Sequence, residues 1–317
     1  MANELFIPSS LDAALATSVA DYSKTITDNV YNANVVLKLL NQRKRLINGG
    51  VSVVYPLIKS DQNAGGFYSG NQQLNTAQPD AETQVEYRWQ NVYEPVQLTR
   101  DEERINSGDE HKLIDLAGEK MHRAELAISK RVEQAFSTPV AGAGNIVDLE
   151  TLVNTGTLGT VAGATDTFWQ ATVTASGSFA AQGLTDLTTA FYAVSSAEDS
   201  DTPTVILTDK TNFQRFEQTR SPLERIQNGN LTANAGFRNL TFKGVPVTYG
   251  NFIGSGLMFG LNMNYVDYNV DSETDFAMTP FLMPVNQTSK VAFILHRTTG
   301  PVTMNRRRNF KLTGLTA

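Results

Sequence analysis

The sequence predicts an α+β protein in which one long helix and several short strands are joined by extended connections. Apolar residues recur every three or four positions between residues 99 and 136, which is the period of an amphipathic helix. Residues 51–58 and 84–98 are rich in β-branched and aromatic side chains, as strands are. Residues 240–270 form a run of short strands broken by glycine and proline. A chain of 317 residues allows two domains or one large one.

The composition excludes several classes of function. With no cysteine and three histidines, the chain has no disulfide framework and no thiolate metal site, and a multi-histidine metal site is not expected. A net charge of −6 argues against a protein that coats nucleic-acid phosphates. Only 18% of the residues are charged, below the typical fraction of about 25%, which indicates a surface that lies partly against partners. We expect a soluble cytoplasmic protein, because neither a signal peptide nor a membrane-spanning apolar run is present.

Residues 1–50 are predicted to form an N-terminal arm. Two short helical patches, around residues 11–19 and 35–40, place apolar side chains on one face. The Asn-Gly-Gly sequence at 48–50 is predicted to end the second patch. Neither patch could hold a core alone, so we expect the arm to lie on another surface.

Residues 51–98 are predicted to form two strands joined by a long connection. The connection, residues 60–83, is polar and glycine-containing, and it is long for a compact domain. It is either a disordered surface loop or, as we favour, a projecting two-stranded arm that packs on another subunit, since an isolated hairpin is marginal in water. The candidate contact residues near its tip are Asn63, Gly65, Gly66, Phe67 and Tyr68.

Residues 99–139 cover the long helix, which is expected to act as the spine of a domain. Thr99 and Glu102 have the spacing of a capping box, and Thr138-Pro139 is predicted to end the helix. Acidic side chains gather in its first turn. They are candidate contacts for cations of a neighbouring subunit: Asp101, Glu102 and Glu103.

Residues 140–285 are predicted to hold a small mixed α/β core after a linker rich in glycine, alanine and threonine. The elements expected in it are a helix at 184–194, a strand at 204–208, a helix at 209–217 capped by Asp209, and short strands at 240–270.

Residues 286–317 are predicted to form two closing strands that flank Thr299-Gly300. The second strand contains Arg306, Arg307 and Arg308, of which the first and third would share one face. These cations form either a solvated face or, as we slightly favour, ion pairs with an acidic patch on a neighbouring subunit. The acidic turn at 271–275 and the first turn of the long helix are the candidate partners.

The motifs of common catalytic sites are missing from the sequence. It contains no nucleophile elbow and no phosphate-binding loop. The glycines of 254–260 lack dinucleotide-binding spacing, so we interpret them as a turn between strands. The turn at 271–275 lacks the glycine and the glutamate that a calcium loop needs, so it is predicted to be a solvated acidic turn. We therefore expect no catalytic residue, no metal and no cofactor.

Taken in order, these segments resemble the major capsid protein of tailed bacteriophages, which has the Hong Kong 97-type fold. The resemblance rests on NGGVSVVYPLI (48–58), the helix at 99–136, TPTVILTDKTNFQRFEQ (202–218), NLTFKGVPVTYG (239–250), GSGLMFGLNMNYVDYNV (254–270) and RTTGPVTMNRRRNFKLTGL (297–315). The resemblance implies an N-terminal arm (1–50), an extended E-loop (51–98), a peripheral P-domain with its spine helix (99–139) and closing strands (286–317), and an axial A-domain with strands that return to the P-domain (140–285).

The resemblance implies a shell protein that self-assembles into the hexamers and pentamers of an icosahedral head enclosing double-stranded DNA, without sequence-specific binding. It implies assembly in the bacterial host cytoplasm and a place in the virion. The implied partners are further copies of the chain, a portal protein, a separate scaffolding protein and, as an option, a decoration protein. One alternative is an encapsulin-like nanocompartment shell. The other, from a different class, is a non-assembling enzyme or binding domain of phage origin.

Overall fold

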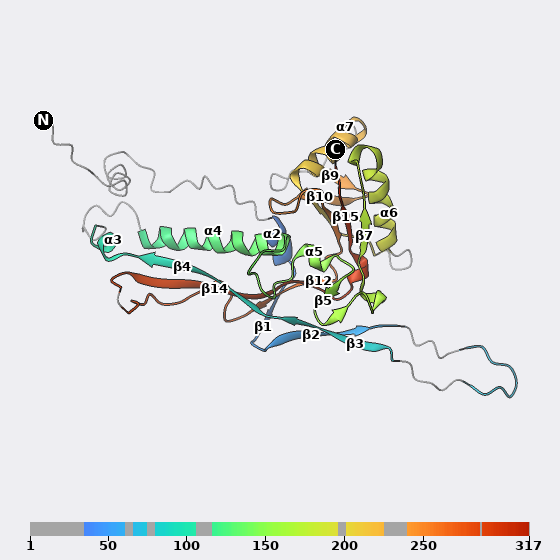
Figure 1. The fold of residues 1–317 in the computed structure, drawn as a ribbon, viewed down its shortest axis with the longest axis horizontal. Helices are drawn as coiled ribbons and strands as arrows, with labels where there is room; N and C mark the ends of the chain where they lie inside the picture. The colour runs from blue at the N-terminus through green and yellow to red at the C-terminus, as the bar shows by residue number, and fades with distance from the viewer. Residues whose placement is uncertain are drawn as a thin grey trace. The chain divides into compact units, whose positions relative to one another are not determined.

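The computed structural model describes residues 35–60, 66–74, 80–105, 116–195, 201–224, 240–285 and 287–316 (Figure 1). The chain divides into two compact units. The described residues of the first unit fall within 93–128 and 278–295, and those of the second within 33–92, 129–277 and 296–317. The mixed helix and sheet content agrees with the α+β prediction.

A six-stranded sheet forms the centre of the second unit. Its strands, in spatial order, are β7 (Thr172–Ala175), β15 (Phe310–Thr313), β11 (Met258–Leu261), β8 (Val205–Thr208), β10 (Val245–Tyr249) and β9 (Leu240–Phe242). The pairs β7–β15 and β8–β10 are parallel, and the other three pairs are antiparallel. Parallel neighbours need long crossover connections, and the intervening chain supplies helices for them.

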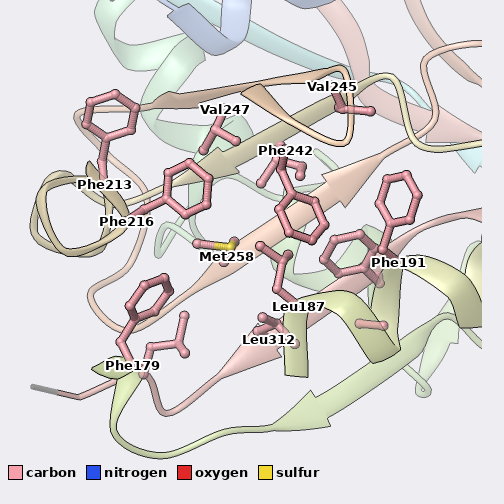
Figure 2. Packing of buried hydrophobic residues seen from close by; sticks show 14 of the residues in the cluster. Phe179, Leu187, Phe191, Phe213, Phe216, Phe242, Val245, Val247, Met258 and Leu312 are labelled. Atoms are coloured by element: carbon pink, nitrogen blue, oxygen red, sulfur yellow. The ribbon is translucent and has the colours of Figure 1, made fainter. Parts of the chain in front are cut away.

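The helices α6 (Leu184–Val194) and α7 (Lys210–Glu224) close the hydrophobic core of this sheet. In α6 the buried residues Leu187, Ala190, Phe191 and Val194 follow the period of one helix face. Figure 2 shows Met258 of β11 between the side chains of both helices and those of the strands. The predicted helices and the predicted strand between them are confirmed, with α7 extending beyond the expected end. Asp209 caps α7, since its carboxylate accepts hydrogen bonds from the Thr211 and Asn212 amides at 3.2 and 3.4 Å.

A second sheet joins segments from opposite ends of the chain. Its order is β1 (Lys44–Ile47), β12 (Val266–Asp271), β14 (Lys290–Thr303) and β13 (Ala277–Met278), and β4 (Gln90–Leu98) also pairs with β14. The helix α2 (Val35–Asn41) confirms the helical patch at 35–40. The helix was predicted to end at 48–50, and this is wrong. It ends at Asn41, because Lys44–Ile47 form β1 and pair in parallel with β12.

The predicted turn at Thr299-Gly300 is also wrong. Both residues lie inside β14, a single strand of 14 residues. Gly300 permits this because it has φ +81°, and a Cβ there would lie 2.4 Å from the Val147 carbonyl oxygen. The register of β12 and β14 shifts beside it, between Asn269 and Val270. A glycine in a strand interior marks a bulge here rather than a reversal of the chain.

The strands β2 (Ser52–Ile58) and β3 (Glu82–Arg88) form a separate two-stranded ribbon, paired from Ser52↔Arg88 to Ile58↔Glu82. The predicted strand at 84–98 is thus divided into β3 and β4. The division falls at Trp89, whose ring packs 5.2 Å from the Arg297 guanidinium carbon.

The predicted long helix corresponds to α3 (Arg100–Ile105) and α4 (Leu116–Ser137), and residues 106–115 lie outside the described residues. The capping box is confirmed by a 2.9 Å bond from the Thr99 amide to Glu102 Oε2 and a 3.3 Å return bond. Helix α4 ends directly before Thr138-Pro139, as predicted. Its buried residues Ala124, Ile128, Val132 and Ala135 belong to the predicted apolar stripe.

Several short elements belong to the second unit. They are α5 (Leu149–Leu152), the hairpin β5 (Thr157–Leu158) and β6 (Val161–Ala162), and the turns η1 (Thr167–Trp169), η2 (Phe179–Gly183) and η3 (Arg306–Arg308). The closing segment 286–317 is therefore not a pair of neighbouring strands. β14 lies in the second sheet and β15 in the six-stranded sheet.

Candidate subunit-contact surfaces

The β2–β3 arm (residues 52–88) carries exposed aromatic side chains beyond its paired strands. At its base the Lys59 amide donates to the Ala81 carbonyl at 2.7 Å, and Lys59 Nζ lies 3.5 Å from Asp80 Oδ2. Farther along the chain, the Phe67 side chain is fully exposed and Tyr68 is 67% exposed. Burying one such ring on a partner would contribute about 1.5–3 kcal/mol. Of the other candidates, Gly66 is exposed, and Asn63 and Gly65 lie outside the described residues.

A second set of exposed apolar side chains belongs to the first unit, and the sequence analysis missed it. We call it the apolar patch. Its members are Tyr93 of β4, Phe293 of β14, and Met278, Leu282, Met283 and Val285 of the segment that pairs with β14. The Tyr93 and Phe293 rings meet edge to face at 6.1 Å. The signal that could have revealed it is the apolar run 276–285, which contains too few polar residues for a solvated connection.

The acidic candidates at the start of the long helix are not equivalent. Glu102 is already paired within its own unit. Lys120 Nζ lies 2.7 Å from both of its carboxylate oxygens and 3.0 Å from the Gln97 carbonyl oxygen. Burial opposes the charge of Glu102, but the bonds from Lys120 and Thr99 outweigh it and hold the pKa of Glu102 below its usual value. Asp101 is exposed, whereas the Glu103 side chain lies outside the described residues.

The arginine cluster does not form a strand, and this expectation is corrected. Residues Arg306–Arg308 form the 3₁₀ turn η3, because their flanks enter two different sheets. The Arg306 side chain is fully buried, and burial lowers its pKa to about 10. Its guanidinium donates to the carbonyl oxygens of Leu152 at 2.8 Å, Gly156 at 2.6 Å, Trp169 at 3.1 Å and Thr151 at 2.6 Å. Arg306 is therefore an internal residue and cannot reach a neighbouring subunit.

The other two arginines separate on the surface. Arg308 lies 3.7 Å from Asp201 Oδ2 and donates to the Val194 carbonyl at 3.3 Å. Arg307 alone of the three has an exposed side chain. The candidate cation for a subunit contact is thus reduced from three arginines to Arg307.

The acidic turn at 271–275 is solvated only in part, since Ser272 and Glu273 are exposed but the two aspartates are bonded within the subunit. Asp271 is buried, and it accepts hydrogen bonds from the Gly49 amide at 3.1 Å and the Thr274 hydroxyl at 2.8 Å. Asp275 pairs with Lys44 of β1. These bonds tie the turn to β1 and its continuation, so its two aspartates are already paired within the subunit.

The buried histidine has a structural environment. His296 Nε2 lies 2.7 Å from the Tyr268 hydroxyl, and its ring stacks on Phe276 at 4.4 Å. Burial lowers its pKa to about 4, despite Asp275 at 3.6 Å. Among the described residues, no three histidine or carboxylate side chains converge as metal ligands would. None of the described helices is long and apolar enough to cross a membrane.

Comparisons with known proteins place the fold. No protein-family model and no curated sequence matches the chain. The solved capsid of cyanophage A-1(L) matches 94% of this chain and 97% of its own, with a TM-score of 0.63 and 16% identity. The capsid of a native GTA particle matches 98% and 100%, with a TM-score of 0.65 and 12% identity. The SrpI encapsulin complex of Synechococcus elongatus matches 98% and 96%, with a TM-score of 0.61 and 12% identity.

Proposed function

We propose that this chain, which has the fold of phage capsid proteins, is the major subunit of an icosahedral phage head. The observation that carries the proposal is the near-complete correspondence of the fold in both directions, over 94% of this chain and 97% of the cyanophage capsid chain. Fold alone does not determine function, so the proposal also rests on the surfaces that the subunit leaves uncovered.

The exposed surfaces suit a subunit that is completed by its neighbours. The β2–β3 arm carries the exposed rings of Phe67 and Tyr68. The apolar patch contains the exposed rings of Tyr93 and Phe293 and four further side chains that are each more than 40% exposed: Met278, Leu282, Met283 and Val285. Large exposed apolar surfaces in a soluble protein mark interaction sites. In the proposed head, copies of this chain in hexamers and pentamers cover both surfaces.

The domain assignment follows the fold with one revision. We assign residues 1–50 to the N-terminal arm, the β2–β3 arm to the E-loop, α3, α4 and β14 to the P-domain, and the six-stranded sheet to the A-domain. The revision moves β15 from the P-domain to the A-domain, since it pairs with β7 and β11.

The remaining parts of the proposal concern the contents and partners of the shell. An acidic subunit with net charge −6 suits a head that a motor fills with double-stranded DNA better than one that condenses nucleic acid by charge. The proposal further includes assembly in the host cytoplasm and a non-enzymatic role. The proposed partners are a separate scaffolding protein, a portal protein and a decoration protein outside the shell.

Electron microscopy of the purified full chain, with and without co-expressed scaffold, tests the proposal. Closed icosahedral shells are expected, and a dispersed monomer under all conditions would contradict it. The second candidate is an encapsulin-like compartment, favoured by the match to the SrpI encapsulin complex. Native particles distinguish the two: DNA inside supports the phage head, and an enzyme cargo supports the compartment.

A further inference from the structure

An Asn-Gly dipeptide lies where β1 ends and the β2–β3 arm begins. Asn48 follows Ile47, the last residue of β1, and Gly49 precedes β2. Both residues of the dipeptide are exposed. In an Asn-Gly sequence the glycine nitrogen can attack the asparagine side-chain carbonyl carbon, because glycine has no Cβ to obstruct the cyclic imide that forms. The polar groups around these two atoms therefore decide how readily the ring closes.

The end of β12 holds this dipeptide in a fixed position. The parallel pairing of β1 with β12 places Ile47 opposite Asp271. The Ser272 amide donates to the Ile47 carbonyl oxygen at 3.1 Å, directly after both strands end. Asp271 and Ser272 therefore lie beside Asn48 and Gly49, and groups that the fold holds together can act together in one reaction.

The Asp271 carboxylate is bonded to the nitrogen that would attack. The Gly49 amide donates to Asp271 Oδ1 at 3.1 Å. Burial favours the neutral form of Asp271, but the bonds from Gly49 and Thr274, together with the charge of Arg297, outweigh it and hold the pKa of Asp271 below its usual value. Asp271 is therefore charged at neutral pH, and a charged carboxylate at hydrogen-bond distance can accept the proton that the nitrogen loses.

The Ser272 hydroxyl is bonded to the carbonyl group that would be attacked. It donates to Asn48 Oδ1. Attack on this carbonyl moves negative charge onto Oδ1, and a donor already aimed at that oxygen stabilises the charge. The space beside the nitrogen is open, since no atom lies within 4 Å of the position that a Cβ on Gly49 would occupy. The two hydrogen bonds thus activate the two partners of one reaction.

We propose that Asn48-Gly49 is a self-modification site, at which the end of β12 promotes conversion of Asn48 to aspartate or isoaspartate. The Gly49 nitrogen forms a bond to Asn48 Cγ, and the bond from Cγ to Nδ2 breaks. Asp271 passes the proton of Gly49 to the leaving nitrogen, which departs as ammonia. Water then opens the cyclic imide on either side of the Gly49 nitrogen. The net reaction consumes one water, releases ammonia and adds one negative charge to the chain.

The modification changes the junction between β1 and the β2–β3 arm. Opening at the side-chain carbonyl gives aspartate, whose charge lies beside that of Asp271. Opening at the main-chain carbonyl gives isoaspartate, which adds one carbon to the main chain between β1 and β2. Either product alters the base of the arm within the single subunit, so the proposal does not depend on the shell-forming role.

Peptide mass spectrometry of the full chain, incubated at neutral pH, tests the proposal. The tryptic peptide 46–59 contains Asn48 as its single asparagine. Conversion of Asn48 should be at least about tenfold faster in the folded protein than in the same chain unfolded in urea, because only the fold supplies the two hydrogen bonds. An equal or slower rate in the folded protein would overturn the proposal, since it would show that the bonds lock the turn against reaction.

A substitution at Ser272 separates the effect of its hydroxyl from that of the fold as a whole. Ser272→Ala should slow the conversion of Asn48 in the folded protein about tenfold. The matched control is Glu273→Ala at the next exposed position of the same turn, and it should convert at the rate of the unaltered protein. The second Asn-Gly sequence of the chain, Asn228-Gly229, is the internal reference and should react equally in all three proteins. An unchanged rate at Asn48 in Ser272→Ala would refute the assigned role of the hydroxyl and with it the proposal.

Discussion

At the scale of single residues, several ionisable side chains are buried and form their hydrogen bonds within the subunit. Arg306 is surrounded by four carbonyl oxygens, and His296 is bound to Tyr268. The sequence shows three adjacent arginines but not which of them turns inward. That choice depends on where α5 and η1 place their carbonyl groups, and no local pattern encodes this placement.

Arg306 is predicted to be essential for the stability of the second unit. The substitution Arg306→Met should lower the free energy of unfolding by about 3–5 kcal/mol, because it leaves four carbonyl groups without their donor. Urea denaturation followed by circular dichroism measures the change. Arg307→Met is the control, and at an exposed position it should change stability by less than about 0.5 kcal/mol. Equal effects of the two substitutions would show that the buried contacts do not stabilise the fold.

At the scale of elements, the sequence predicted what local periodicity and capping determine. The stripe Ala124–Ile128–Val132 of α4, the Thr99–Glu102 capping box and the Asp209 cap are examples. It failed where pairing between distant segments decides. β1 is a strand because it meets β12 more than 200 residues away, and position 300 within β14 has no room for a Cβ because the Val147 carbonyl oxygen lies against it. The candidate contacts show the same difference. Phe67 and Tyr68 could be selected from the sequence and are exposed, and their contact with a neighbour stays a prediction, whereas the apolar patch depends on strand pairing and was missed.

The aromatic residues of the β2–β3 arm are predicted to serve assembly rather than folding. Phe67→Ser combined with Tyr68→Ser should leave the free energy of unfolding of the monomer unchanged within about 0.5 kcal/mol, because both side chains are exposed. Assembly should require several-fold more protein, as measured by light scattering. The control is Val51→Ser, an equally exposed apolar residue at the base of the arm. Assembly at the normal concentration would argue that the tip touches no neighbour.

The apolar patch is predicted to be a contact between copies of the chain. Leu282→Ser combined with Val285→Ser should leave the thermal midpoint of the monomer within about 2 °C of that of the unaltered protein, because both side chains are exposed. The double substitution should reduce the yield of shells in sedimentation, because it removes apolar area that a neighbour would bury. Val173→Thr on β7, also a partly exposed apolar position, is the control. If the double substitution lowers the thermal midpoint strongly instead, the patch belongs to the fold of the subunit.

At the scale of the whole molecule, the fold is recognisable although few residues are shared. The matched capsid and encapsulin chains have 12–16% identity with this chain, yet they align over nearly its entire length. What persists is the order of elements together with their apolar faces, and many sequences satisfy such a pattern. The fold class was therefore predictable from pattern, while the residues that contact partners had to be read from exposure and pairing.

The position of β15 has a consequence for the order of events during protein synthesis. This strand lies between β7 and β11, yet a ribosome makes it after every other strand of the sheet. Until Phe310–Thr313 emerges, β7 lacks its partner and Phe310 and Leu312 are missing from the hydrophobic core. A nascent chain therefore cannot complete its largest sheet early. Interrupted products keep unpaired edges that favour degradation or aggregation over incorporation among finished subunits.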